Sequence, residues 1–471
     1  MHTDSRGLSV TASSQRSIEQ LDRAVDAYLA SQRDTMDRVE NLLRDDPDCP
    51  LGHCLAGYLQ MHRVKREGVQ GAKESLARAI GAPGSPVLLP REKLHVLALE
   101  AWIGRDLIAA LARWEAILAD YPRDILAVRL AQFMTSYLGN SQGICDSVER
   151  VFSKWGPSVP GYSHVLGCYA YGLEEAGNYS LAEYYGRLAI ASNPHDLWAA
   201  HAVTHVMEMQ GRPREGLALI TELEPWWQGC GNFVLHLKWH SALFHLALED
   251  FDHVISVYDH EVRTASTDEY LDIANAASVL WRLEQANVAV GSRWEELAKR
   301  ASERREEHLF AFADLHYAIA AAAGVPGDAE RLLESCETFA GAGDGTQAQV
   351  MAEVGLAVVK AIVAHRRGSY AEATDRLLSR RRLIQRVGGS HAQRDTFEHL
   401  LIDSAIRAGD SETAKQLLAE RTTARPHDLW SWRTWAKLAD ATGSREDAAA
   451  AQLQLVRLLS GEGRTIYNAP I

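Results

Sequence analysis

Turns recur at a spacing of 34 residues in two separate parts of this chain. Gly177 and Gly211 lie 34 residues apart, and so do Gly409 and Gly443. A period of 34 residues is typical of tetratricopeptide repeats, in which each unit is a pair of helices. One pair cannot bury its apolar face alone, so successive pairs stack on one another. The spacing therefore predicts an extended array of helical hairpins.

Small residues and prolines fit the same register. In a repeat that begins at Ser163, Ala182 and Ala189 stand where two helices pack closely, and Pro194 follows the second helix. Strand-like alternation is rare, whereas Ala, Leu, Glu and Arg recur at helical spacing. We therefore predict an all-α fold, a right-handed superhelix (α-solenoid) of about nine or ten tetratricopeptide-like hairpins. Further turns are expected at Gly104, Gly139, Glu249–Phe251 and Gly368.

The chain is expected to form one continuous solenoid over residues 1–471, although the clarity of the repeat varies along it. Non-repeat loops are expected near 81–90 and 324–327, and a pinch near 340–345. The predicted sections are N-terminal helical hairpins at 1–110, tetratricopeptide-like repeats with a histidine-rich groove at 111–268, irregular helical hairpins at 269–345 and C-terminal tetratricopeptide-like repeats at 346–471.

Composition excludes several classes of protein. A chain that is 46% hydrophobic and 24% charged has globular composition. Its net charge of -13 disfavours nucleic acid as a partner, because phosphate binding needs a basic surface. The six cysteines are scattered and indicate reduced thiols rather than a disulfide framework. The polar N-terminus lacks an apolar signal core, and no run approaches the roughly 18 apolar residues of a membrane span. We expect a cytoplasmic protein that binds neither nucleic acid nor membrane, with a homo-oligomer left open.

The helix predicted after Asp196 carries the motif H-x-x-x-H-x-x-E in His201, His205 and Glu208. Residues four and three positions apart share one face of a helix. In the repeat register that begins at Leu197, these three residues and Trp198 take the positions that face the concave groove. The positions that pack two helices together fall on small or apolar residues, namely Ala200, Val203, Thr204 and Met207. The motif therefore predicts a polar patch on the groove face.

The two neighbouring repeats place similar residues on the same face. Their groove positions, or positions directly beside them, hold His164, Tyr171, Glu174, His236, Trp239 and His240. Adjacent inner helices of such an array lie about 10 Å apart, so side chains from neighbouring helices can meet. The register therefore predicts a histidine-rich concave pocket built by residues 164–240.

With these residues in view, the chain resembles the tetratricopeptide repeat protein 38 family over nearly its whole length. The matching pieces are VLGCYAYGLEEAGNYSLAE (165–183), HAVTHVMEMQGR (201–212), HLKWHSALFHLAL (236–248) and RDTFEHLLIDSAIRAGD (394–410). In that family the third piece usually reads more like HNWWHLALFHL, whereas Leu237-Lys238 stand here and put a lysine near the groove. The resemblance implies a superhelix with a histidine-rich inner face, and it implies no established reaction.

Three functions remain open for this pocket, and the first is metal binding. Histidines four apart on a helix can both reach one ion, and a carboxylate three positions further can complete or orient the set. A divalent metal would be held by His201, His205 and Glu208 together with His240, or with His236 in its place.

The second function is metal-free catalysis or small-molecule binding, as in a hydrolase or other acid/base enzyme. His201 and His205 would be the acid/base groups, with Glu208 as their partner, because histidine titrates near neutral pH. Cys168 or Tyr171 could act as a nucleophile or bind the ligand. Substrate contacts would come from His164, Tyr171, Glu174, Trp198, His236, Trp239 and His240.

The third function is recognition of a peptide or partner protein, which concave repeat surfaces commonly provide. We favour this interpretation, and leave open whether the protein is an enzyme. Two other segments carry candidate residues. Arg394, Asp395, Glu398 and His399 could close the groove from the far side, although exposed ion pairing is favoured. His391 follows Gly388-Gly389-Ser390, where an ordinary loop is favoured over a lid.

Overall fold

The computed structural model describes residues 2–81, 87–264 and 267–460. The predicted loop at 81–90 falls in part on residues 82–86, which lie outside the described residues. The described residues are helical throughout, apart from two short N-terminal strands that pair antiparallel and the connecting turns. The all-α fold class is therefore confirmed.

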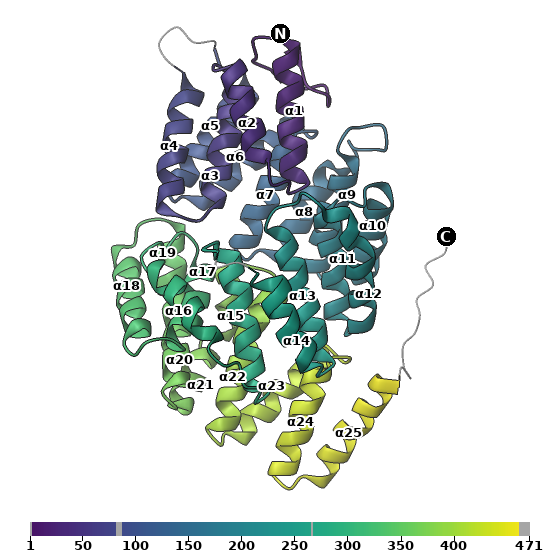
Figure 1. The fold of residues 1–471 in the computed structure, drawn as a ribbon, viewed down its shortest axis with the longest axis vertical. Helices are drawn as coiled ribbons and strands as arrows, with labels where there is room; N and C mark the ends of the chain where they lie inside the picture. Colours follow the sequence, from purple (N-terminus) through teal and green to yellow (C-terminus); the bar gives the residue numbers. More distant parts are fainter. Residues whose placement is uncertain (1, 82–86, 265–266, 461–471) are drawn as a thin grey trace.

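The first third of the chain forms the upper part of the molecule in Figure 1. Its elements are β1 (His2–Thr3), β2 (Ser9–Val10), α1 (Gln15–Leu29), α2 (Thr35–Asp45), α3 (Pro50–His62), α4 (Arg66–Ile80), α5 (Pro90–Ile103), α6 (Leu107–Asp120), α7 (Ile125–Tyr137) and α8 (Ser141–Phe152).

The middle third carries the helices predicted to build the pocket. Its elements are α9 (Tyr162–Glu175), α10 (Tyr179–Ser192), α11 (Leu197–Met209), α12 (Pro213–Leu223), η1 (Glu224–Trp227), α13 (Phe233–Ala247), α14 (Phe251–Val257), η2 (Tyr258–Val262), α15 (Tyr270–Gln285) and α16 (Arg293–Glu303).

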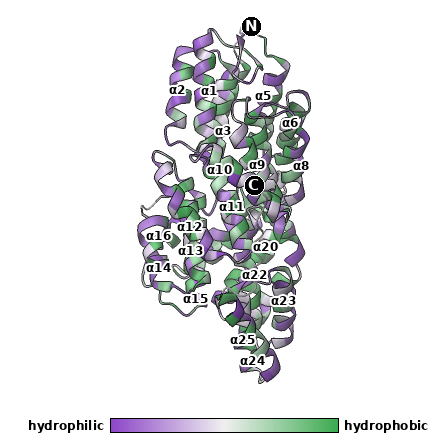
Figure 2. Cartoon of the chain, turned by 90° about the vertical axis from the view of Figure 1, so that its right-hand side faces the viewer, coloured by the Kyte–Doolittle hydropathy of each residue, from purple (hydrophilic) through white to green (hydrophobic). Residues whose placement is uncertain are grey.

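The last third runs to the far end of the molecule. Its elements are α17 (Ala311–Ala322), α18 (Asp328–Ala342), α19 (Thr346–Val350), η3 (Met351–Gly355), α20 (Leu356–Arg366), α21 (Tyr370–Leu378), η4 (Arg381–Val387), α22 (His391–Arg407), α23 (Ser411–Ala424), α24 (Leu429–Ala441) and α25 (Arg445–Ser460). Figures 1 and 2 both place α24 and α25 at the end of the long axis opposite the N-terminus.

The helices pair with their neighbours along the chain, from α1 with α2 to α24 with α25. Counting α19, η3 and α20 as one continuous helix gives twelve consecutive pairs in the described residues, more than the nine or ten predicted. Turns without a glycine account for part of the difference: Val64 and Asn287 adopt positive φ at two turns that were not predicted, at 52° and 61°. Two predicted turns also place a non-glycine residue at positive φ, namely Arg105 at 65° and Glu249 at 58°. At the predicted turn near Gly104, the left-handed residue is thus Arg105.

The repeat boundaries in the centre follow from local chemistry. The Asp196 carboxylate accepts hydrogen bonds from the N–H groups of Trp198 and Ala199 at 3.0 and 3.1 Å, and so caps the start of α11. Gly211 ends that helix with φ of +64°, a conformation that glycine adopts without strain. The other predicted turn glycines share positive φ, namely Gly139, Gly177, Gly368, Gly409 and Gly443.

Later hairpins occupy the concave side of earlier ones. The Glu175 carboxylate in α9 accepts a hydrogen bond from the backbone N–H of His391 at 3.0 Å. Arg433 in α24 donates to the carbonyl of Ala247 at 2.7 Å. Near the N-terminus, the Lys65 ammonium pairs with Asp268 at 2.6 Å. The concave face of α9, α11 and α13 is therefore covered by protein rather than open to solvent.

Among the described residues, one helix is long and apolar enough to cross a membrane by length and composition. It runs over Thr346–Arg366 with a mean hydropathy of 1.4, and 67% of that window is buried inside the fold. It packs against α17, α18 and α22. Burial on this scale is what a core helix of a helical array shows.

Candidate functional site

Four buried histidines meet between two neighbouring helices. His201 and His205 lie four residues apart on α11, and His236 and His240 lie four apart on α13. One ring nitrogen from each lies within 4.8 Å of those of the other three. The ring centroids of His201 and His205 are 4.2 Å apart, and those of His205 and His240 are 4.7 Å apart. We call these four residues the histidine quartet.

Hydrogen bonds from outside the quartet orient three of its rings. His205 Nδ1 lies 3.2 Å from Glu174 Oε2, and His240 Nδ1 lies 2.7 Å from Glu208 Oε2. His236 Nδ1 lies 3.1 Å from Asn275 Oδ1. A ring whose Nδ1 donates to an oxygen presents Nε2 on its other side.

The inward nitrogens have few partners. His201 Nε2 lies 3.0 Å from His236 Nε2. The Nε2 atoms of His205 and His240, and Nδ1 of His201, are buried without a hydrogen-bond partner among the described residues. Buried polar atoms without partners are costly and uncommon, so three in one cluster call for an explanation.

Burial also shifts the protonation of the quartet and its neighbours. It lowers the pKa of His201, His236 and His240 well below the usual range, and the other imidazoles lower the pKa further. Burial opposes charge on His205 as well, but the nearby Glu174 carboxylate raises the pKa of that imidazole. Burial raises the pKa of Glu208 to about 7. The environment therefore favours neutral imidazoles at three of the four positions.

The remaining predicted residues surround the quartet or stand away from it. The Tyr171 ring lies 5.6 Å from that of His201 and 4.7 Å from that of Trp198. The Trp239 ring stacks on His236 at 5.0 Å, and its Nε1–H donates to Ser278 Oγ at 2.7 Å. His164 lies apart, with Nδ1 3.0 Å from Asp196 Oδ2.

The predicted groove is not an open groove, which corrects one part of the sequence analysis. His201 is 3% exposed, and His205 and His240 are fully buried. The reason is the covering by later helices, since α15 packs on α13 and α22 packs on both α11 and α15. Tyr171, Glu174, His236 and Trp239 are likewise buried, so none of them lines a solvent channel.

Two further sequence interpretations change. Burial raises the pKa of the Cys168 thiol to about 12, so this thiol is not an activated nucleophile. Lys238 forms ion pairs with Glu224 at 2.7 Å and Glu261 at 2.6 Å, away from the quartet. The departure from the family pattern at Leu237-Lys238 therefore does not bring a lysine into the cluster.

A cavity of about 340 Å³ lies next to the quartet, and we call it the C-terminal cavity. The ends of α11 and α13 line it together with α15, α22, the end of α23 and α24. Of the catalytic, substrate-binding and metal-binding residues predicted from the sequence, only Glu208 borders it. The Glu208 carboxylate is 16% exposed and bonds His240, so this residue separates the cavity from the quartet.

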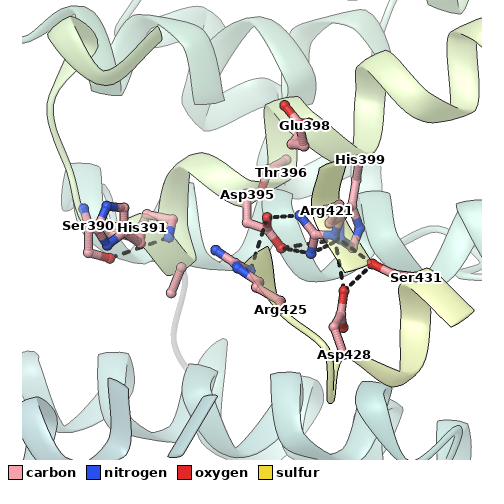
Figure 3. Close-up of polar contacts among 12 residues, drawn as sticks. Ser390, His391, Asp395, Thr396, Glu398, His399, Arg421, Arg425, Asp428 and Ser431 are labelled. Atoms are coloured by element: carbon pink, nitrogen blue, oxygen red, sulfur yellow. Dashed lines mark hydrogen bonds and ion pairs between the residues drawn. The ribbon is translucent and has the colours of Figure 1, made fainter. Parts of the chain in front are cut away.

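The far wall of the cavity is an ion network on α22, α23 and α24 (Figure 3). Arg421 Nη2 lies 2.8 Å from Asp395 Oδ2, and its Nε lies 3.0 Å from Asp428 Oδ2. The His399 ring stacks on Trp430 at 3.6 Å between centroids, nearly parallel. The favoured interpretation of this segment as exposed ion pairing is wrong, because Asp395 and His399 are largely buried and close the concave side.

The loop before α22 is packed rather than lid-like. Gly388 and Gly389 both have positive φ, and a Cβ on Gly388 would lie 2.8 Å from the backbone of Tyr137. Ser390 caps α22 by accepting from Gln393 N–H at 3.3 Å. This agrees with the ordinary loop that the sequence favoured.

Several cavity residues carry no signal in the sequence. Arg282 on α15 donates to Thr396 Oγ1 at 2.7 Å, across a separation of 114 residues. Among the described residues it forms no ion pair within 4.0 Å, and burial lowers its pKa. Arg421 and Trp430 likewise line the cavity only because separate hairpins pack against one another. Only the spacing of Asp395 and His399 on one helix face pointed toward this wall.

No family model matches the chain. A chain in the structure of Naa15/Naa10 bound to HypK-THB is similar over 93% of this chain and 68% of its own, at 13% identity and a TM-score of 0.25. The crystal structure of yeast Tom70 is similar over 93% of this chain and 99% of its own, at 12% identity and a TM-score of 0.27. Neither likeness bears on the site, and membership of the tetratricopeptide repeat protein 38 family stays a prediction.

Proposed function

We propose that this protein binds a peptide segment of a partner protein in the C-terminal cavity, and that the segment presents a carboxylate and an apolar side chain. The observation that carries the proposal is the cavity itself, at about 340 Å³ with both basic and aromatic residues in its walls. Concave sites of this size that combine apolar surface with placed polar groups are typical of specific ligand recognition. A cytoplasmic location, expected from the sequence, is part of the same proposal.

Charge in the cavity favours an acidic ligand. Six arginines and one lysine line it, against five carboxylates. Arg421 is matched by Asp395 and Asp428, but Arg282 and Lys437 have no ion pair among the described residues. A ligand carboxylate would complete this balance, and arginine presents donors suited to carboxylate oxygens.

The rest of the lining favours an apolar side chain beside that carboxylate. Phe244, Phe251 and Trp430 contribute aromatic surface to the walls. The Trp430 ring is held in place by stacking on His399. Rigid aromatic walls gain more from burying an apolar group than flexible side chains do, because little conformational entropy is lost.

The enzyme alternative has one observation in its favour. Among the predicted catalytic residues, Glu208 places its carboxylate at the cavity wall, while His201 and His205 stand behind it. A small-molecule substrate in the cavity would thus meet Glu208 as an acid/base group, backed by His240. Measured turnover of ester or amide substrates that is lost in Glu208→Gln would favour this candidate.

Fluorescence anisotropy with labelled short peptides tests the binding proposal. The peptides of two libraries vary between Leu and Phe at the same positions. One library carries Glu and a free C-terminus, and the other carries Gln and a C-terminal amide. We expect the acidic library to bind more tightly, and Lys437→Ala to weaken its binding about 3- to 10-fold. Lys93→Ala, an exposed lysine on α5, is the matched control and should change nothing. Equal binding of both libraries, or equal effects of both variants, would overturn the proposal.

A further inference from the structure

We propose that the histidine quartet binds one divalent first-row transition-metal ion, such as Zn²⁺, through one nitrogen of each of His201, His205, His236 and His240. This inference stands independently of peptide binding in the cavity. It also differs from the ligand set predicted from the sequence, because His236 takes the place given there to Glu208.

The spacing of the nitrogens fits a shared ion. With metal–nitrogen bonds of about 2.0–2.1 Å, nitrogens bound to one ion lie about 3.3–3.4 Å apart in tetrahedral geometry and about 2.8–3.0 Å apart at adjacent octahedral positions. His201 Nε2 and His236 Nε2 are 3.0 Å apart, and one nitrogen of each member lies within 4.8 Å of the others. The four ligands come from two successive inner helices, each supplying a pair at i and i+4.

The hydrogen bonding of the quartet has the form that metal sites need. Two Nε2 atoms, on His205 and His240, are buried with no hydrogen-bond partner among the described residues. A bound ion would satisfy both lone pairs, whereas neutral imidazoles facing one another leave them unsatisfied. The opposite nitrogen of each of these rings bonds a carboxylate, the arrangement that fixes the tautomer and strengthens a histidine ligand.

Charge balance points in the same direction. Four neutral imidazoles leave the 2+ charge of an ion uncompensated, and an uncompensated buried charge is strongly unfavourable. Glu174 and Glu208 are both bonded to quartet rings and, when ionised, supply two negative charges beside the ion. Charge compensation of a bound ion would explain why two carboxylates lie in this buried part of the core.

The ligands restrict the kind of ion and its role. An all-imidazole set suits Zn²⁺, Fe²⁺, Ni²⁺ or Cu²⁺, whereas Ca²⁺ and Mg²⁺ require oxygen ligands. Four protein ligands fill a tetrahedral ion and leave no open position, which is typical of a structural site. The ion would tie α11 to α13 and fix Glu208, which forms part of the cavity wall.

Metal analysis of the full chain tests this inference. Protein expressed in medium supplemented with Zn, Mn, Fe, Co and Ni is analysed by elemental mass spectrometry, and chelator-treated protein is titrated with Zn²⁺. We expect about one equivalent of one metal per chain. The X-ray absorption spectrum should fit nitrogen ligands at about 2.0–2.1 Å. Less than ~0.2 equivalents after both loading routes would overturn the inference, and so would a sulfur-containing shell.

Variants locate the ion. The double variant His201→Gln, His236→Gln should hold less than ~0.2 equivalents. His316→Gln is the matched control, since His316 is a buried imidazole on α17 that donates to the carbonyl of Phe312 at 2.8 Å. If the double variant does not fold, Glu208→Gln provides the test instead. Loss of a carboxylate that bonds a metal-ligating histidine lowers metal affinity about 10- to 100-fold. Unchanged Zn²⁺ affinity in folded double variant, or in Glu208→Gln, would contradict the assignment.

Discussion

His240 Nδ1 lies 2.7 Å from Glu208 Oε2, and this hydrogen bond joins the buried histidine quartet to the wall of the C-terminal cavity. Two proposed sites thus share one carboxylate. The shared residue makes it possible to separate the two proposals with a single substitution.

Glu208→Gln should weaken one site and not the other. Metal affinity should fall about 10- to 100-fold, because an amide orients and strengthens the His240 ligand less than a carboxylate does. Binding of acidic peptides should not weaken, since the substitution removes a negative charge from the cavity wall. Zn²⁺ titration and peptide anisotropy on the same protein sample check both effects. A parallel loss of both activities would mean that the variant disrupts the fold rather than either site.

The ion network on the far wall should contribute strongly to stability. Asp395→Asn leaves the Arg421 guanidinium with less compensation in a buried position, and breaking one side of a buried pair costs about 3–5 kcal/mol. Asp34→Asn breaks an exposed pair with Arg38 on α2 and should cost less than about 1 kcal/mol. Urea unfolding followed by circular dichroism measures both. Equal costs would show that the Asp395 network is solvated.

Gly211 and Gly177 offer a matched pair of turn glycines. Both have positive φ, at 64° and 84°. A Cβ on Gly211 would lie 2.3 Å from the carbonyl oxygen of His427, whereas one on Gly177 would meet nothing within 4 Å. Gly177→Ala should cost about 1–2 kcal/mol from the backbone conformation alone. Gly211→Ala should cost clearly more in the free energy of unfolding, because the clash displaces the C-terminal hairpins. Similar costs would contradict the close packing of these turns.

Stability should fall as the pH drops below about 6.5, the ordinary pKa of histidine. Burial lowers the pKa of His62 to about 3. Between these two values the unfolded chain takes up a proton that the folded chain does not, so acid favours unfolding. At pH 5 this single histidine should remove about 2 kcal/mol relative to pH 7. In His62→Gln the difference in unfolding free energy between pH 7 and pH 5 should shrink by that amount. An unchanged difference would show that His62 is protonated in the fold.

Much of the fold was predictable because it is set by local signals. The spacing of Gly177 and Gly211 gave the helical pair, and the register placed His201, His205 and Glu208 on the inner face of α11, where the structure has them. Turns at residues such as Val64 and Asn287 were missed because a non-glycine residue takes the left-handed conformation there. The number of hairpins was therefore underestimated.

The cover over the histidines could not be predicted. It depends on contacts such as that of Glu175 with His391, which are 216 residues apart in the sequence. The residue pattern within one repeat does not show how strongly the array of hairpins curves, or whether later hairpins cover earlier ones. For the same reason, no sequence signal indicated that Arg282 and Trp430 line the cavity. The packing of α13 beside α11 also places His236, and not Glu208, in the cluster of possible metal ligands.

Anomalous X-ray diffraction from crystals of the Zn²⁺-loaded full chain tests the histidine quartet most directly. Data collected on either side of the zinc absorption edge locate the ion without assumptions about its ligands. We predict one strong peak between α11 and α13, about 2.0–2.1 Å from a nitrogen of each of His201, His205, His236 and His240. Absence of a peak there in zinc-loaded crystals, or a strong peak only elsewhere, such as between His245 and His253, would contradict the assignment.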